Sequence, residues 1–302
     1  MVDLTGMTTE VRNPSTTNLD MMTPLELATV MNSEDEKVIL AVRAVLPQVA
    51  IAIEWTTAAL KNGGRIIYIG AGTSGRLGVL DAAECPPTFG VSSDRVVGLI
   101  AGGESALVKS VEGAEDSHEL GTEDLKAIGL DAEDVVIGLS ASGRTPYVLY
   151  ALRYARSIGC KTAVIACNSP SVIGAEVDLA IEPITGPEVL TGSTRLKAGT
   201  AQKLILNMIS TGAMAGVGKV YENLMVDVQQ TNEKLVSRAR NIVVSATGCS
   251  SEEAVKALEE ADGSAKVAIV MILGGFTAAR AREALEASGG RVREAIVEAA
   301  AE

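Results

Sequence analysis

Residues 65–76 read Arg-Ile-Ile-Tyr-Ile-Gly-Ala-Gly-Thr-Ser-Gly-Arg, an apolar run that passes directly into a turn of glycine and hydroxyl residues. This pattern is typical of a buried strand that leads into a helix. Glycine lets the backbone approach an anion closely, and the free amides and dipole of a helix N-terminus favour a phosphate there. The stretch therefore predicts a strand, a phosphate-binding turn and a helix in succession.

A second turn of the same kind is Ser140-Ala-Ser-Gly-Arg-Thr-Pro146, which follows the apolar run Asp134-Val-Val-Ile-Gly-Leu139. Each turn combines glycine, hydroxyl side chains and one arginine, Arg76 or Arg144. We therefore predict that the two turns grip one small phosphorylated ligand from two sides. The candidate binding residues are Thr73, Ser74, Gly75, Arg76, Ser140, Ser142, Gly143 and Thr145.

The first turn allows two other interpretations. Gly70, Gly72 and Gly75 match the glycine pattern of a dinucleotide-binding turn. The acidic residue expected after the next strand would fall near Gly102-Gly103, with Glu104 just beyond, and NAD binding gives no reason for a second serine turn. Alternatively, both turns are purely structural and their hydroxyls are helix N-caps.

Five short β-rich runs alternate with helical segments in the middle of the chain. Because the runs are apolar on both faces, they suit a parallel sheet that helices cover. We predict an α/β fold with a doubly wound parallel sheet. The runs are residues 65–70, 95–100, 134–140, 161–167 and 178–183.

Helical patterns flank this region on both sides. An irregular arm to about Met22 precedes a capping box at Thr23-Pro-Leu-Glu26. Ser33-Glu-Asp-Glu36 repeats the capping pattern before an amphipathic stretch to Lys61 that Pro47 interrupts. Residues 1–64 are therefore expected to form an N-terminal arm and helices that pack on the core.

Helices are also expected at about residues 196–217 and 226–245. From about Gly248, turn signals punctuate three short Ala-rich helical patterns. We place a domain boundary near Thr247. The expected domains are a core that carries the two phosphate-binding turns, with following helices, over residues 65–247 and a small helical module, similar to a UBA domain, over residues 248–302.

Composition narrows the class of protein. The 302 residues with 47% apolar content can form a sizeable core, and the net charge of -12 argues against general binding to nucleic acid or anionic membranes. The longest apolar run, near Val267 to Ala279, is shorter than the roughly 20 residues of a membrane span, and the N-terminus lacks a signal-peptide pattern. We expect a cytoplasmic enzyme or binding protein without nucleic-acid or membrane partners.

A metal site is not expected. His118 is the single histidine, and the four cysteines show no paired metal-binding spacing, so they are interpreted as buried thiols. Chemistry would then depend on carboxylates, hydroxyls or lysine. His118 itself is interpreted as a solvated helix residue rather than a catalytic one.

Two acidic segments are candidates for this chemistry: Asp81-Ala-Ala-Glu-Cys-Pro-Pro-Thr88 and Glu112-Gly-Ala-Glu-Asp-Ser-His118. The adjacent prolines should end a helix and hold the chain after Glu84 in an extended form. The second segment should begin a helix, whose dipole would be a sufficient structural reason for Glu115. Two carboxylates beside a bound sugar could divide general acid and general base work.

With these motifs assembled, the chain closely resembles the N-acetylmuramic acid 6-phosphate etherases, members of the sugar isomerase (SIS) fold family. The resemblance covers nearly the whole chain, and Glu-Cys-Pro-Pro-Thr at 84–88 and Glu-Gly-Ala-Glu-Asp-Ser at 112–117 are its most specific parts. The matching segments are residues 23–26, 70–78, 81–88, 101–104, 111–117, 140–147, 188–202, 223–227, 231–234 and 246–249.

The resemblance implies cleavage of the D-lactyl ether of N-acetylmuramic acid 6-phosphate, without a metal or redox cofactor, in cell-wall amino-sugar recycling. It implies that Glu84 and Glu115 are the catalytic pair. We assign Glu84 as the general acid at the ether oxygen and Glu115 as the base at carbon 2. SIS proteins commonly build such sites between subunits, so a homodimer is expected. Arg195 and Lys197 are additional candidates for ligand contact.

Two alternatives stay open. The same fold serves sugar-phosphate-binding regulators, among them the glucokinase regulatory proteins, but a regulator need not retain two carboxylates at the sugar. An aldose–ketose isomerase begins with the same proton removal and expels nothing. Release of lactate distinguishes the three functions.

Overall fold

The chain divides into two compact units. The computed structural model describes residues 7–109, 111–228 and 233–300. One unit comprises Met1–Ala83 and Asp94–Ser210, and the other comprises Glu84–Ser93 and Thr211–Glu302. Two helices, α3 (Gly72–Phe89) and α7 (Lys197–Gly216), therefore contribute residues to both units.

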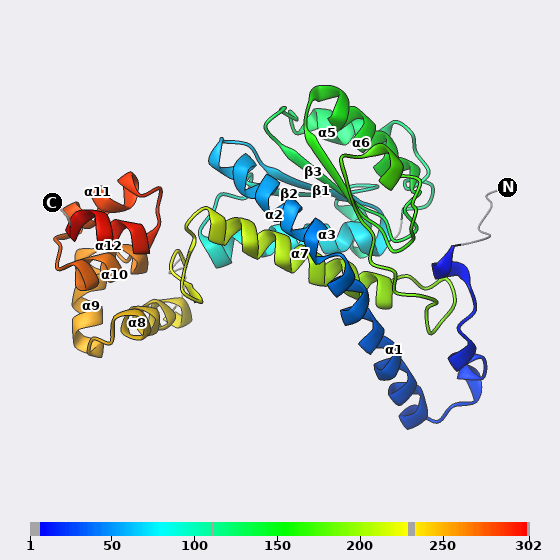
Figure 1. Ribbon diagram of the computed structural model, residues 1–302, viewed down its shortest axis with the longest axis horizontal. Coiled ribbons are helices and arrows are strands. Elements are labelled where there is room, and N and C mark those ends of the chain that lie inside the picture. Colours follow the sequence, from blue (N-terminus) through cyan, green and yellow to red (C-terminus); the bar gives the residue numbers. More distant parts are fainter. Residues whose placement is uncertain (1–6, 110, 229–232, 301–302) are drawn as a thin grey trace. The chain divides into compact units, whose positions relative to one another are not determined.

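A five-stranded parallel sheet forms the centre of the first unit, in the order β2-β1-β3-β4-β5. Helices α5 (Leu120–Ala127) and α6 (Pro146–Ile158) cover one face, and α2 (Leu46–Lys61) and α3 cover the other (Figure 1). All five expected strands are present, so the predicted doubly wound α/β fold is confirmed. The strands are β1 (Ile66–Gly70), β2 (Val96–Ile100), β3 (Val135–Leu139), β4 (Lys161–Ile165) and β5 (Leu179–Ile181).

The strand order places both serine turns at one point of the sheet. The chain leaves β1 toward β2 on one side and returns to β3 on the other, which makes β1 and β3 the topological switch point. Ligands of doubly wound sheets bind in the crevice at the carboxyl ends of the strands at this point. Gly70 is paired with Leu139 across the two strands, so the turns that begin at Ala71 and Ser140 leave the sheet side by side.

The N-terminal helices are α1 (Pro24–Ala44) and α2, and the predicted capping box at Thr23 and Glu26 is confirmed. The second capping pattern was interpreted wrongly, because residues 33–36 lie inside α1 and Glu34 is buried. No single described helix is both long and apolar enough to cross a membrane; α1 and α2 reach that length and composition only together, bent by 61°.

The N-terminal arm, where the structure describes it, is non-periodic as expected, with single turns of 3-10 helix at Thr8–Glu10, Pro14–Thr16 and Leu19–Met21. It is nevertheless bound to loops of the same unit. The Thr8 amide donates a hydrogen bond to Asn168 Oδ1 over 2.8 Å, and the Thr16 hydroxyl donates one to the Val189 carbonyl over 2.8 Å.

The end of α3 differs from the expectation. Pro86 and Pro87 lie within the helix, which continues to Phe89, so Glu84 is on a helix rather than before an extended segment. The prolines give up two amide hydrogen bonds, yet their fixed φ is close to the helical value. Cys85 and Phe89 are buried beside them, and this packing maintains the last turn.

The second unit is mostly helical. A two-stranded hairpin of β6 (Val220–Tyr221) and β7 (Leu224–Met225) precedes α8 (Glu233–Thr247), which corresponds to the helix expected near residues 226–245. Four short helices follow, not three, because Gly289 and Gly290 with positive φ separate the last two. These helices, the C-terminal module, are α9 (Ser251–Glu260), α10 (Ala265–Gly274), α11 (Ala278–Ala287) and α12 (Val292–Ala300).

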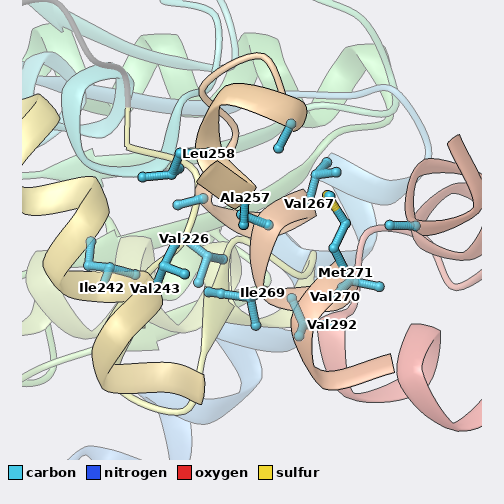
Figure 2. Packing of buried hydrophobic residues seen from close by; sticks show 14 of the residues in the cluster. Val226, Ile242, Val243, Ala257, Leu258, Val267, Ile269, Val270, Met271 and Val292 are labelled. Atoms are coloured by element: carbon cyan, nitrogen blue, oxygen red, sulfur yellow. The ribbon is translucent and has the colours of Figure 1, made fainter. Parts of the chain in front are cut away.

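One apolar core connects α8 with the C-terminal module. Ile242 and Val243 of α8 belong to the same buried cluster as Leu258 of α9 and Val270 of α10 (Figure 2). The compact unit therefore includes residues on both sides of the boundary expected near Thr247, and α8 is not separated from the helices that follow it.

Candidate functional site

The first serine turn places the N-terminus of α3 against the end of β1. A Cβ atom on Gly75 would lie only 2.6 Å from the carbonyl oxygen of Gly70, so a residue larger than glycine would push the helix away from the strand. Thr73 and Arg76 are half-buried on this turn, and Arg76 Nε donates a hydrogen bond to the Leu107 carbonyl over 3.0 Å. The arginine is thereby oriented at the carboxyl edge of the sheet.

Ser74 differs from its neighbours in being buried. Its hydroxyl donates a hydrogen bond to Oε1 of Gln202 on α7 over 2.8 Å. The Gln202 amide nitrogen in turn donates to the Ile165 carbonyl, at the end of β4, over 3.4 Å. The hydroxyl of Ser74 thus has a protein partner, and its position depends on α7.

Three hydroxyls converge in the second serine turn. Ser140 Oγ lies 2.8 Å from Thr145 Oγ1 and 3.3 Å from Ser142 Oγ, and it accepts a hydrogen bond from the Gly143 amide over 3.0 Å. Ser140 is buried, whereas Ser142 and Thr145 are half-buried. Among the described residues, Thr145 occupies the N-cap position of α6 without a capping hydrogen bond from its side chain, so capping does not account for its hydroxyl.

Gly143 makes the second turn possible. Its φ is +69°, and a Cβ atom there would lie 2.4 Å from the Ser171 Cβ. Both the backbone conformation and the close packing therefore require glycine. The result is a short loop at the N-terminus of the 13-residue helix α6, a location that favours an anion.

A pocket of about 280 Å³ opens beside the first turn, and the predicted residues Arg76 and Glu115 both line it. The backbone carbonyl of Glu115 accepts a hydrogen bond from the Tyr147 amide over 3.1 Å, in the first turn of α6. Glu115 therefore connects the pocket with the second serine turn. The full lining comprises Ala71, Gly72, Arg76, Ala101, Ala106, Val111, Glu112, Gly113 and Glu115.

Comparison with known proteins agrees with this geometry. Residues 114–211 match the SIS domain family, and residues 48–156 match the family described as the glucokinase regulatory protein N-terminal SIS domain. The phosphoheptose isomerase from Francisella tularensis covers 64% of this chain and 100% of its own, with a TM-score of 0.50 at 17% identity. At that identity the likeness concerns the fold alone.

Sequence relatives cover the chain almost completely. A protein of Pectobacterium atrosepticum named N-acetylmuramic acid 6-phosphate etherase is 58% identical over 296 residues, which is 98% of each chain. One of the same name from Enterobacter sp. strain 638 is 59% identical over 295 residues, 98% of this chain and 99% of its own. This chain belongs to the N-acetylmuramic acid 6-phosphate etherases. The etherase motif at residues 231–234 lies partly outside the described residues.

In this member of the etherase family the two candidate catalytic carboxylates are on different units. Glu115 belongs to the first unit with both serine turns, and Glu84 belongs to the second, on the last part of α3. Both side chains are exposed. The structure therefore brings Glu115 together with the predicted binding turns of the first unit, whereas Glu84 belongs to the second.

The acidic segment around Glu115 does not begin a helix, contrary to the expectation. The helix α5 starts at Leu120, whose amide donates to the Ser117 hydroxyl over 3.1 Å, and Gly113 has a φ of +75° in a preceding turn. Glu115 is thus a loop residue, and the dipole of α5 is no structural reason for it. His118 is exposed with its ring stacked on Tyr150 at 4.4 Å between centroids.

Lys197 is buried, unlike a ligand contact, and forms an ion pair with Glu34 of α1 in which the two charged atoms are 2.7 Å apart. Burial alone would raise the pKa of Glu34, but hydrogen bonds from Lys197, Lys37 and Asn13 lower it to about 2. The pair ties α1 to the first residue of α7. Arg195, the other candidate, is exposed.

Glu188, also buried, accepts hydrogen bonds from the amides of Lys197 and Ala198 over 3.0 Å each. It satisfies donors at the N-terminus of α7. Burial raises the pKa of the Glu188 carboxyl, and these two hydrogen bonds oppose that rise.

Sequence reasoning missed the roles of Glu34, Glu188 and Gln202, which bind Lys197, the N-terminus of α7 and Ser74. Glu34 and Gln202 are 163 and 128 positions from their partners Lys197 and Ser74, so no local spacing could reveal these pairs. Glu188 is only 9 and 10 positions from the amides that it binds. Within the described parts of the chain, no group of three or more histidine, cysteine or acidic side chains is arranged to hold a metal ion.

Proposed function

We propose that the protein cleaves the D-lactyl ether of N-acetylmuramic acid 6-phosphate and releases D-lactate and N-acetylglucosamine 6-phosphate. It would thus be a carbon–oxygen lyase of amino-sugar recycling. The observation that carries the site assignment is the placement of Glu115, a residue that lines a pocket and whose backbone carbonyl accepts a hydrogen bond from the helix that follows the second serine turn. The near full-length identity of 58% and 59% to relatives named for this activity supports the reaction.

An alkyl ether offers no electrophilic carbonyl to water, so elimination is the accessible route. In the opened sugar, the aldehyde at carbon 1 acidifies the hydrogen on carbon 2. Glu115 removes that proton, the bond between carbon 3 and the ether oxygen breaks, and Glu84 protonates the departing lactate oxygen. Water then adds to the double bond, with hydroxide at carbon 3 and a proton at carbon 2.

The phosphate would bind at the second serine turn. Ser142 and Thr145 supply half-buried hydroxyls there, beside the positive end of the α6 dipole, whereas the Tyr147 and Val148 amides already donate to the Glu115 and Thr145 carbonyls. Ser140 would act from within the turn, because it is buried and already bonded to Gly143 and Thr145. Binding the phosphate retains the unsaturated intermediate until water has added.

The first turn would contribute mainly backbone amides and Arg76. The Thr73 amide lies at the N-terminus of α3, and Ser74 supports this turn through Gln202; the Gly75 amide instead donates to the Ala71 carbonyl over 3.1 Å. Arg76 lines the same pocket as Glu115, so its guanidinium would bind an anionic group of the substrate beside the base.

We include a homodimer and a cytoplasmic location in the proposal. Leu25, Ile39 and Leu40 are exposed apolar side chains on α1, and association of two chains would cover such residues. Light scattering after size exclusion should give about twice the chain mass of 31.2 kDa. A mass of one chain would remove the dimer from the proposal.

The decisive experiment is a lactate assay with the substrate in oxygen-18 water, on the wild type and on the Glu84→Ala and Glu115→Ala variants. We expect unlabelled lactate, oxygen-18 at carbon 3 of the amino sugar, and loss of turnover in both variants. Label in the lactate would mean attack by water on the lactyl carbon, which the proposed elimination forbids.

A sugar-phosphate-binding regulator is the second candidate, favoured by the match of residues 48–156 to the regulatory-protein domain. It would bind the sugar phosphate through the same turns and release no lactate. Isothermal calorimetry beside the lactate assay separates the two functions, because binding without lactate release supports the regulator.

A further inference from the structure

A buried lysine joins the C-terminal module to the end of α7. Lys266, in the first turn of α10, is 7% exposed, and its Nζ donates a hydrogen bond to the Gly218 carbonyl over 2.8 Å. The same ammonium is ion-paired with Asp227, whose carboxylate is also 3.3 Å from Lys219 Nζ. Burial lowers the pKa of Lys266 and the Asp227 charge opposes that effect.

The backbone of Asp227 packs closely against the end of α3. Gly90 follows the helix with a φ of +62°, and a Cβ atom on it would lie 2.3 Å from the Asp227 carbonyl oxygen. The Gly90 amide closes α3 by donating to the Pro86 carbonyl over 2.9 Å. Glu84 is six residues before Gly90, less than two helical turns away.

The segment just before α12 contacts the same region. Arg291 Nη2 donates to the Gly216 carbonyl at the end of α7 over 3.2 Å. Gly218 approaches the Gly290 carbonyl so closely that a Cβ on it would lie 2.9 Å from that oxygen. All these residues belong to the second unit, so the module, the end of α7 and the end of α3 form one connected structure.

Burying the Lys266 ammonium costs desolvation free energy that an apolar side chain at this position would not cost. The apolar cluster of Figure 2 already holds α8 and the C-terminal module together, and a buried ion pair is often replaced by apolar side chains with little loss of stability. Beyond packing, the pair restricts the position of Asp227. The Lys266 ammonium binds both the Gly218 carbonyl and the Asp227 carboxylate, and this double contact fixes where the Asp227 backbone lies.

We propose that Lys266 is a positioning residue for Glu84: through Asp227 and Gly90, the C-terminal module sets the position of the part of α3 that carries this carboxylate. The inference rests on the proposed function, in which Glu84 protonates the leaving oxygen. Lys266 touches neither substrate nor reacting atoms in this role. It acts through the helix end alone.

The test is a double-mutant cycle on the full chain. The paired variant Lys266→Met with Asp227→Asn removes both charges and leaves no unpaired buried charge. We expect kcat for lactate release to fall about tenfold to a hundredfold, as for a slightly misplaced catalytic group, with KM changed less than about twofold. In the Glu84→Gln background the paired variant should cause no further loss.

Arg282→Met is the matched control, because Arg282 makes an ion pair with Asp262 at the surface of the same module. It should leave kcat unchanged.

An unchanged kcat in a folded paired variant, or an equal loss with and without Glu84, would overturn the inference while leaving the proposed reaction intact. A wild type that releases no lactate would instead contradict the proposed function. If the paired variant does not fold, Asp227→Asn alone is combined with Glu84→Gln, and kcat for lactate release is compared with and without Glu84.

Discussion

The Ser74 hydroxyl donates a hydrogen bond to Oε1 of Gln202 across 2.8 Å, and both side chains are buried. This bond attaches the first turn of α3 to α7. The Gln202 amide also donates a hydrogen bond to the Ile165 carbonyl. Through Gln202, the position of the start of α3 therefore depends on the carboxyl end of β4 as well as on β1. The geometry of the first serine turn is therefore a tertiary property and not only a local one.

Ser74→Ala should consequently affect stability more than substrate affinity. Loss of a buried hydrogen bond that leaves Gln202 unsatisfied costs about 1 to 3 kcal/mol. We expect a lower free energy of unfolding in urea and a KM within about threefold of wild type. An unchanged unfolding free energy together with a large rise in KM would mean that the Ser74 hydroxyl binds the substrate directly.

Ser142→Ala should show the opposite balance. Its hydroxyl is half-buried at the N-terminus of α6, and a hydrogen bond to a charged phosphate is worth about 1.5 to 3 kcal/mol. We expect KM to rise about tenfold or more with kcat little changed. Ser157→Ala is the control, because Ser157 is exposed at the other end of α6 and bonds only to the Tyr154 carbonyl among described partners. A large loss of kcat without a change in affinity would contradict phosphate binding by Ser142.

Glu115→Gln and Glu84→Gln should remove activity without affecting stability. Both carboxylates are exposed, so an isosteric amide costs little folding free energy. Loss of a general acid or base lowers turnover by about 10² to 10⁴. Lactate release and thermal unfolding, measured on the same preparations, check both parts. Glu119→Gln, an exposed neighbour of Glu115, should behave as wild type, and an active Glu115→Gln would exclude this residue as the base.

The strands and turns were predictable because their signals are local. Residues 65–76 contain an apolar run and the glycines that a close strand-to-helix turn requires, and the structure places β1 and the start of α3 within them. Ser140 to Thr145 repeat that pattern. Both turns therefore followed from short-range sterics and hydrogen bonding, and the strand order then brought them together at the switch point.

Local rules failed where tertiary contacts decide. Pro86 and Pro87 predicted the end of a helix, yet burial of their neighbours Cys85 and Phe89 keeps the last turn of α3 helical. Lys197 was a candidate for ligand contact, but it is buried and paired with Glu34 on α1. That partner is 163 residues away and could not be inferred from spacing.

The Glu34–Lys197 pair gives a prediction for acid stability. The folded-state pKa of Glu34, about 2, is below its ordinary value of 4.5, so folding favours the charged carboxylate. Its stabilising effect is complete above about pH 4.5 and is lost as the pH falls toward 2. At about 1.4 kcal/mol per pKa unit, the loss amounts to about 3 kcal/mol.

The double variant Glu34→Leu with Lys197→Met removes that titration while avoiding an unpaired buried charge. Lys197→Met alone should cost about 3 to 5 kcal/mol at pH 7, because it leaves the Glu34 carboxylate buried without its main partner, and Glu34→Leu should restore most of this loss. The Lys197 charge also lowers the pKa of Glu188, so the comparison is repeated with Glu188→Gln in both proteins, and the remaining difference reports Glu34. Urea unfolding at several pH values between 3 and 6 should therefore show a shallower decrease with acid in the double variant than in wild type. Parallel decreases would mean that Glu34 does not stabilise the fold through its charge.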